Sequence, residues 1–123
     1  MLVGGEGRRL RPLTDTRPKP MMQLVDRPFV AHQLDLLRRH GVGDVIFSCG
    51  YRPDALRDHF GDGSAIGVRL RYVVDPEPLG TAGAIKNAEA LLDDAPFLVL
   101  NGDILTDLDL RAFTARHRET GAA

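Results

Sequence analysis

The chain has 123 residues, 43% of them hydrophobic, and a formal net charge of −1. This length allows one domain with a single hydrophobic core, and the balanced charge argues against a general nucleic-acid surface. No apolar run reaches the roughly 18 residues of a membrane-spanning helix. The single cysteine, Cys49, excludes an intrachain disulfide and fits a reduced, cytoplasmic setting.

A glycine-rich, basic loop opens the chain. Residues 1–3 predict a short strand that leads into Gly4, Gly5 and Gly7. The basic side chains that follow are Arg8, Arg9, Arg11, Arg17 and Lys19. Consecutive backbone N–H groups surrounded by cations can cradle a polyphosphate, and a tight turn before a solvated basic loop is the alternative. Because neither the P-loop nor the dinucleotide fingerprint is present, we expect a more highly charged ligand, such as a nucleoside triphosphate.

Lys19 lies between two prolines, Pro18 and Pro20. The prolines restrict the backbone on both sides and would aim the ammonium group in a fixed direction. A solvent-exposed lysine with no partner does not need a restricted backbone on both sides, so the pattern favours a ligand-binding role.

Helices and strands alternate through the rest of the chain. Segments with apolar residues on one face predict helices over 29–40, 54–60, 81–92 and 109–119, the last with Asp109 as its N-cap. Short apolar or alternating segments predict strands over 44–49, 68–74 and 97–100. This order indicates βαβ units and an α/β, largely parallel sheet covered on both faces. Ligands bind beyond the carboxyl ends of such strands, so we expect three loops to converge: 4–19, 50–51 and 101–103.

Two further segments are candidates for ligand contacts. Asp103 follows the apolar strand 97–100 and a glycine, where a carboxylate could hold Mg²⁺ together with phosphate oxygens; a turn-forming or capping aspartate is the alternative. The helix after Gly80 opens with the small residues of the segment 80–84. These would let a base or phosphate lie against the backbone, or would allow close helix–sheet packing, and the residues alone leave both readings open.

Three motifs, in this order, resemble the signature of the sugar-1-phosphate nucleotidyltransferases: residues 4–21, 77–85 and 100–103. The similarity covers essentially the whole chain, and the pattern is most similar to the mannose-1-phosphate guanylyltransferases of this family. The resemblance implies a Rossmann-like, doubly wound domain of the glycosyltransferase-A type. Residues 1–123 would be its nucleotide-binding portion, which we expect to be incomplete at both ends.

The resemblance also implies a reaction. A nucleoside triphosphate, expected to be GTP, and a sugar 1-phosphate, expected to be mannose 1-phosphate, would give a nucleotide sugar and pyrophosphate. Two cations, Arg9 and Lys19, would be catalytic, and Asp103 would hold Mg²⁺. The nucleotide would be bound by Gly4, Gly5, Gly7, Arg8, Leu79 and Gly80.

One position departs from the family pattern, because Arg8 stands where the family usually has threonine. Three alternatives stay open: a glucose-1-phosphate thymidylyl- or uridylyltransferase, a non-catalytic nucleotide sensor, and a structural partner domain. We expect no nucleic-acid or membrane partner and leave a homo-oligomer open.

Overall fold

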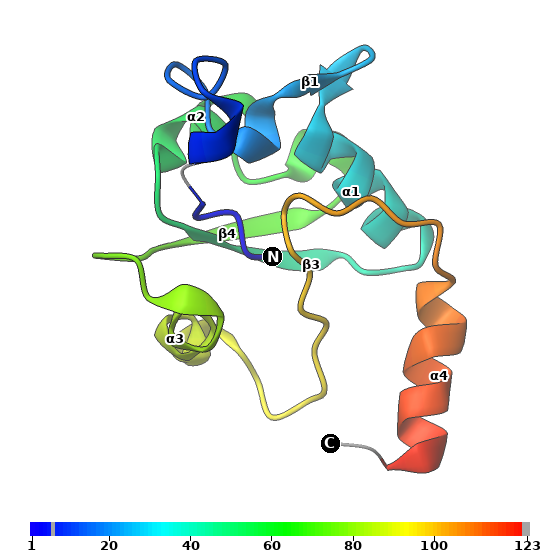
Figure 1. Ribbon diagram of the computed structural model, residues 1–123. Helices are drawn as coiled ribbons and strands as arrows, with labels where there is room; N and C mark the ends of the chain where they lie inside the picture. The colour runs from blue at the N-terminus through cyan, green and yellow to red at the C-terminus, as the bar shows by residue number, and fades with distance from the viewer. Residues whose placement is uncertain (6, 122–123) are drawn as a thin grey trace.

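The computed structural model describes residues 1–5 and 7–121. With η for a short 3-10 helix, the elements in chain order are η1 (Arg8–Leu10), η2 (Lys19–Met21), β1 (Gln23–Leu24), β2 (Arg27–Pro28), α1 (Phe29–Arg39), β3 (Asp44–Cys49), α2 (Pro53–Phe60), η3 (Ser64–Ile66), β4 (Arg69–Val74), α3 (Gly80–Asn87), η4 (Glu89–Leu91) and α4 (Leu110–Thr120). The alternation predicted from the sequence is confirmed from α1 through α3 (Figure 1).

The sheet is parallel and is built around β3. Strand β4 pairs with β3 in a register that runs from Asp44 opposite Arg69 to Cys49 opposite Val74. On the other side of β3, Leu2 forms parallel bridges with both Ser48 and Asn101. Residues 1–3 therefore lie between β3 and the segment that ends at Asn101, as the βαβ prediction requires.

The segment 97–100, predicted as a strand, forms no regular strand. Its neighbour, residues 1–3, bonds to it through Leu2 alone: the Leu2 amide donates to the Leu100 carbonyl, and the Gly102 amide donates to the Leu2 carbonyl, each at 2.8 Å. A ladder needs successive bonded pairs, and this short contact supplies only one. The apolar composition predicted a strand, and it could not show how little partner strand would be available.

Two local features also differ from the prediction. The predicted helix 81–92 begins at Gly80 and ends at Asn87, and a 3-10 turn, η4, follows. A small antiparallel hairpin, β1–β2, was not predicted. Its turn contains Val25, which is 93% exposed and has a φ of 62°, a conformation that β-branched residues rarely adopt and for which the sequence gives no signal.

Helices cover both faces of the sheet, as expected for a doubly wound fold. Figure 1 shows α1 and α2 on one face and α3 on the other. Because successive strand residues point to opposite faces, Val45, Phe47 and Cys49 enter the core that α1 and α2 cover. Phe47, which is fully buried, meets the ring of Tyr72 edge-on with centroids 5.7 Å apart. Cys49 is fully buried and is a core residue, and this burial raises the pKa of its thiol to about 12.

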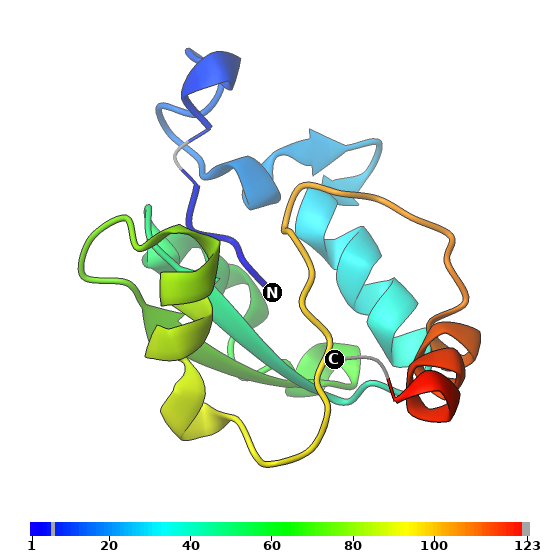
Figure 2. The same cartoon turned by 60° about the horizontal axis from the view of Figure 1, so that its bottom comes forward.

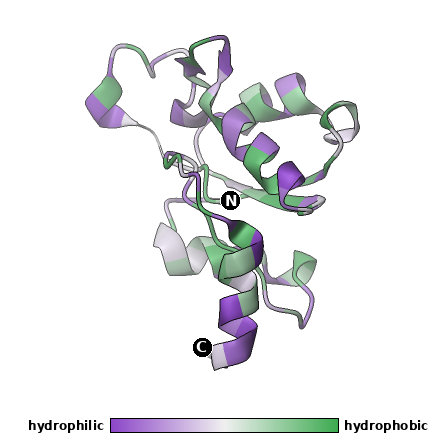
Figure 3. Ribbon diagram, turned by 90° about the vertical axis from the view of Figure 1, so that its right-hand side faces the viewer, coloured by the Kyte–Doolittle hydropathy of each residue, from purple (hydrophilic) through white to green (hydrophobic). Residues whose placement is uncertain are grey.

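Helix α4 is held mainly at its first turn. The predicted N-cap is confirmed, because the Asp109 carboxylate accepts bonds from the amides of Arg111 and Ala112 at 2.9 and 3.0 Å. The Arg111 guanidinium also donates to the carbonyls of Arg39 and His40 at the end of α1. Within α4 only Leu110 is buried, and Figure 3 shows polar residues along much of the rest. None of the described helices is both long and apolar enough to cross a bilayer.

Candidate functional site

The three loops predicted to converge do lie together at the carboxyl end of the sheet. The Tyr51 amide donates to the Gly4 carbonyl at 3.3 Å. A Cβ atom on Gly4 would lie 2.9 Å from the backbone nitrogen of Gly50, and one on Gly102 would lie 2.9 Å from the Leu2 carbonyl oxygen. These approaches are too close for any side chain, so the three glycines let the loops pack backbone against backbone.

Lys19 and Asp103 form an ion pair at this junction, with 2.6 Å between Nζ and Oδ2. Lys19 begins η2, and the prolines on either side of it are both buried. The buried prolines fix the backbone of Lys19, while its side chain stays 36% exposed and that of Asp103 stays 43% exposed. The two charged residues that the sequence singled out on separate motifs therefore stand side by side and open to solvent.

Gly7 links the glycine loop to Lys19. Its φ of +63° lies in the left-handed region, and its carbonyl accepts a bond from the buried Thr14 hydroxyl at 3.0 Å. A Cβ atom on Gly7 would stand 3.2 Å from the Lys19 Cβ. Gly7 thus serves the close packing of the loop against the segment that carries the lysine.

Arg8 and Arg9 lie apart from this packed junction. Both belong to η1, are exposed, and sit at the outer end of a loop that projects from the body of the molecule (Figure 2). The structure does not bring them against Lys19 and Asp103 in the way that it joins those two residues. Their contacts with phosphate stay predictions.

A cleft of about 510 Å³ opens beside the glycine loop. Four of the residues predicted to bind nucleotide line it: Gly4, Gly5, Leu79 and Gly80. A Cβ atom on Gly5 or Gly80 would meet no other atom within 4 Å, so at these two positions the backbone faces open space. This exposed backbone is available to a flat ring or a sugar.

The residues of the segment 80–84 differ in their surroundings. Gly80 opens α3 on the cleft side with a φ of +68°. Gly83 and Ala84 serve packing instead: a Cβ atom on Gly83 would lie 2.8 Å from the Leu79 Cβ, and Ala84 is 7% exposed. The structure therefore supports a packing role at Gly83 and Ala84, and contact of Gly80 with a base or phosphate stays a prediction.

The sequence did not single out Asp75, which also lines the cleft. Its Oδ1 accepts a bond from the Asn87 amide at 2.9 Å, and its Oδ2 accepts one from the Ser48 hydroxyl at 3.2 Å. In the sequence, Asp75 is simply the first polar residue of a proline-rich loop. The signal that could have found it is that a carboxylate follows directly on the parallel strand β4.

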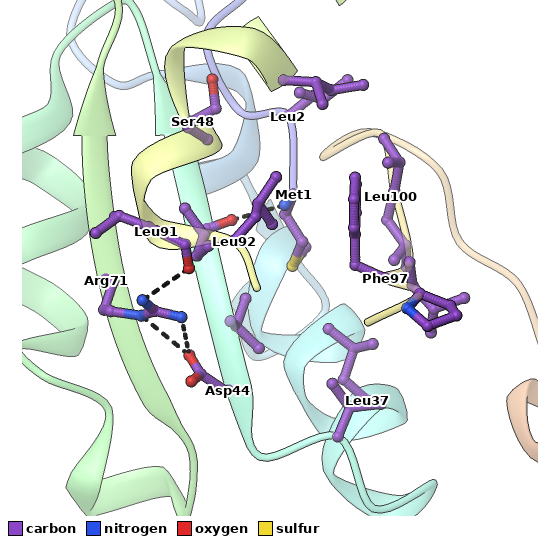
Figure 4. Close-up of a pocket in the computed structure, with 18 of the residues that line it drawn as sticks. Met1, Leu2, Leu37, Asp44, Ser48, Arg71, Leu91, Leu92, Phe97 and Leu100 are labelled. Atoms are coloured by element: carbon purple, nitrogen blue, oxygen red, sulfur yellow. Dashed lines mark hydrogen bonds and ion pairs between the residues drawn. The ribbon is translucent and has the colours of Figure 1, made fainter. Parts of the chain in front are cut away.

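A second, apolar pocket of about 390 Å³ lies on the α3 face of the sheet. Figure 4 shows aliphatic side chains and Phe97 around it. At its edge Arg71 donates to the Asp44 carboxylate at 3.0 Å and to the Leu91 carbonyl at 2.9 Å. None of the residues predicted to bind nucleotide lines this pocket, whereas four of them line the cleft at the carboxyl end of the sheet, so the cleft is the candidate site.

The donor set at Asp103 suits Mg²⁺ only with a phosphate ligand. Mg²⁺ is commonly held by one or two carboxylates together with substrate phosphates and water. In the described part of the chain no group of three His, Cys, Asp or Glu side chains could hold a metal. Asp103, half-exposed at the loop junction, fits the role of the single protein carboxylate in such a site.

The whole chain, residues 1–123, matches the family model described as nucleotidyl transferase. The chain therefore belongs to the nucleotidyl transferase family, and the resemblance seen in its motifs is confirmed. The mannose-1-phosphate guanylyltransferase of Mycobacterium tuberculosis is 42% identical to it over 122 residues, which are 99% of this chain and 34% of that relative. The mannose-1-phosphate guanyltransferase of Candida albicans is also 42% identical, over 100% of this chain and 35% of its own length.

Solved structures agree with this assignment. HddC from Yersinia pseudotuberculosis, complexed with GMP-PN, superposes with a TM-score of 0.84 at 34% identity and covers 94% of this chain and 52% of its own. UDP-glucose pyrophosphorylase from Acinetobacter baumanii superposes with a TM-score of 0.88 at 21% identity, which supports the fold alone. The chain spans about a third of the length of the curated relatives.

Proposed function

We propose that the chain forms the nucleotide-binding part of a sugar-1-phosphate nucleotidyltransferase. The enzyme would convert GTP and mannose 1-phosphate into a nucleotide sugar and pyrophosphate. The observation that carries the proposal is the Lys19–Asp103 pair, 2.6 Å apart across 84 residues of sequence. This pair joins the first motif, residues 4–21, to the third motif, residues 100–103. The pair lies at the carboxyl end of the parallel sheet, where ligands bind in such folds.

The reaction needs little covalent help from the protein. An oxygen of the sugar phosphate attacks the α-phosphorus in line, and pyrophosphate leaves from the opposite side. Catalysis is then a matter of orientation and of charge placed where the phosphates gain it. Lys19, fixed by two buried prolines, supplies one such charge. Arg8 and Arg9 would supply others by folding from the projecting loop onto the β- and γ-phosphates.

Asp103 would hold Mg²⁺ against the phosphates, where the ion offsets their negative charge. The ion pair with Lys19 does not oppose this role. Both side chains are more than a third exposed, and exposed pairs contribute only about 0–1 kcal/mol. Lys19 can therefore turn to a phosphate oxygen at small cost when the nucleotide arrives.

Guanine and mannose are supported by the names of the relatives, since the two curated proteins described above are mannose-1-phosphate guanylyltransferases and HddC was solved with GMP-PN. A thymidylyl- or uridylyltransferase is the alternative. A cytoplasmic location and a homo-oligomer stay predictions.

The test measures nucleotide binding and pyrophosphate release with Mg²⁺, several nucleoside triphosphates and several sugar 1-phosphates. We expect GTP to bind, and Asp103→Asn to remove the dependence of binding on Mg²⁺. Asp107→Asn is the matched control, because Asp107 is an exposed carboxylate on the same connection. Unchanged Mg²⁺ dependence in Asp103→Asn would overturn the metal assignment. Binding without turnover would favour the sensor, and no nucleotide binding would sink the proposal.

A further inference from the structure

A glutamine interrupts the apolar face that α1 turns toward the core. Val30 and Leu34 belong to this face, and Gln33 lies between them, with only 2% of its surface exposed. Its Nε2 donates to the Asn101 carbonyl at 2.8 Å and to the Ile104 carbonyl at 2.6 Å. One amide nitrogen therefore ties α1 to a segment that lies 68 and 71 residues further along the chain.

The two carbonyls are the ends of the turn that carries Asp103. The Asn101 carbonyl also accepts a bond from the Ile104 amide at 3.4 Å, and the Gly102 amide donates to the Leu2 carbonyl at 2.8 Å. Figure 2 shows the connection that begins at this turn, in orange, beside α1. The backbone on both sides of Asp103 is thus held, while its carboxylate stays exposed to solvent.

The other polar atom of the Gln33 amide shows why this position holds a glutamine. In the described part of the chain, no group donates a hydrogen bond to its buried Oε1. A buried oxygen without a partner costs free energy, and a methionine of similar length would fill the space without that cost. What glutamine supplies here is therefore its two N–H donors, which satisfy the carbonyls on either side of Asp103.

We propose that Gln33 is a positioning residue for the metal site, an inference that rests on the proposed function. Gln33 holds the turn so that the Asp103 carboxylate meets the cation in the geometry that Mg²⁺ requires. Mg²⁺ demands a near-ideal octahedron with ligands at about 2.0–2.1 Å, whereas Ca²⁺ accepts flexible arrangements at about 2.3–2.6 Å. A small displacement of the carboxylate should therefore weaken the binding of Mg²⁺ more than the binding of Ca²⁺.

The experiment measures, by titration calorimetry, how much Mg²⁺ or Ca²⁺ raises the affinity of the chain for GTP over its affinity in a chelator. Gln33→Met removes both donors and nearly keeps the length of the side chain. We expect the Mg²⁺ enhancement to fall by about 10-fold, as is typical when a residue that orients a metal ligand is lost. The Ca²⁺ enhancement should fall less, and the metal-free affinity should stay unchanged. A role in packing alone would weaken GTP binding equally with and without metal.

Two further variants make the result specific. Gln33→Glu keeps the shape of the side chain but offers at most one donor to the two carbonyls, so it should also lower the Mg²⁺ enhancement. Leu37→Val changes the same buried face of α1, and should lower the stability of the fold while leaving the enhancement unchanged. Because each enhancement is a ratio measured within one variant, a change in the fraction of folded protein cancels.

The outcomes separate this inference from the proposed function. An unchanged Mg²⁺ enhancement in Gln33→Met, or losses of equal size with Mg²⁺, with Ca²⁺ and without metal, overturns the role of Gln33 and leaves the metal assignment of Asp103 intact. A Mg²⁺ enhancement that persists in Asp103→Asn, or the absence of GTP binding by the unmodified chain, overturns the proposed function and the inference with it.

Discussion

The two halves of the glycine-arginine loop differ in how the rest of the chain holds them. Gly4 touches the backbone of Gly50, and its loop is bound to neighbouring segments by backbone hydrogen bonds. Arg8 and Arg9 sit on an exposed turn that projects from the body (Figure 2). One continuous motif therefore contains a preformed, packed half, which we propose contacts the base and ribose, and an exposed half, which we propose contacts the phosphates. The predictions below test this division, from the largest expected effect to the smallest.

Lys19 stands at the boundary between the two halves, and its removal should have the largest effect. Charged hydrogen bonds contribute roughly 1.5–3 kcal/mol, so we expect Lys19→Ala to weaken Mg²⁺-GTP binding by about 10- to 100-fold. Titration calorimetry measures this directly. Arg17→Ala removes an exposed cation from the same loop and should change the affinity only slightly; equal losses in the two variants would show that Lys19 acts through general charge alone.

Gly4 and Gly5 give a matched pair for the preformed half. A Cβ atom on Gly4 would lie 2.9 Å from the Gly50 nitrogen, whereas one on Gly5 would meet nothing within 4 Å. We expect Gly4→Ala to lower the free energy of unfolding by about 1–3 kcal/mol, and Gly5→Ala to change it by no more than about 0.5 kcal/mol. Urea denaturation checks both. Equal free energies of unfolding for Gly4→Ala and Gly5→Ala would mean that the loop moves to accommodate a Cβ atom at Gly4. Its packing against Gly50 would then not be rigid.

Asp109 tests helix α4, whose described contacts lie mainly at its first turn. Its carboxylate caps α4, and loss of such a cap costs about 1 kcal/mol. In Asp109→Ala we expect faster hydrogen exchange of the α4 amides and little change in the rest of the sheet, because the helix buries only Leu110. Asp107→Ala is the control. A global loss of stability in Asp109→Ala would show that α4 contributes more to the core than its burial suggests.

Asp44 should give the smallest effect, in the pH dependence of stability. A hydrogen bond from Arg69, together with Arg71, holds the pKa of the Asp44 carboxyl below its ordinary value of 3.8. A lowered pKa in the folded state stabilises the fold above that ordinary value, and this contribution is lost as the pH falls through the folded pKa. The urea midpoint should therefore drop less on going from about pH 6 to about pH 3 in Asp44→Asn than in the unmodified chain. The pair is exposed, so screening keeps the difference small.

The sequence predicted most of the fold because its signals are local. Apolar periodicity predicted α1, α2, β3 and β4, and Asp109 as a predicted N-cap gave the start of α4. The pattern failed where the outcome depended on a distant partner. The segment 97–100 has the composition of a strand, but a strand requires a bonded neighbour, and only Leu2 provides one.

The candidate site shows the same division. Glycines, prolines and basic residues are visible in the sequence because each meets a local backbone or charge requirement, so Gly4, Lys19 and Asp103 could be named in advance. Asp75 was not named, although its place directly after β4 is a local signal. Its hydrogen-bond partners could not be predicted, because Ser48 and Asn87 lie 27 and 12 residues away in the chain.

The sequence by itself determined the family, the α/β order of the elements and the chemical groups available to bind a polyphosphate. Only the tertiary structure decided how those groups are arranged. It joined Lys19 to Asp103 and placed Asp75 in the cleft with Gly5 and Gly80, while leaving Arg8 and Arg9 on an open loop. The physical reason is that hydrogen bonds between residues far apart in the chain depend on how the strands pair, and strand pairing is a property of the whole fold.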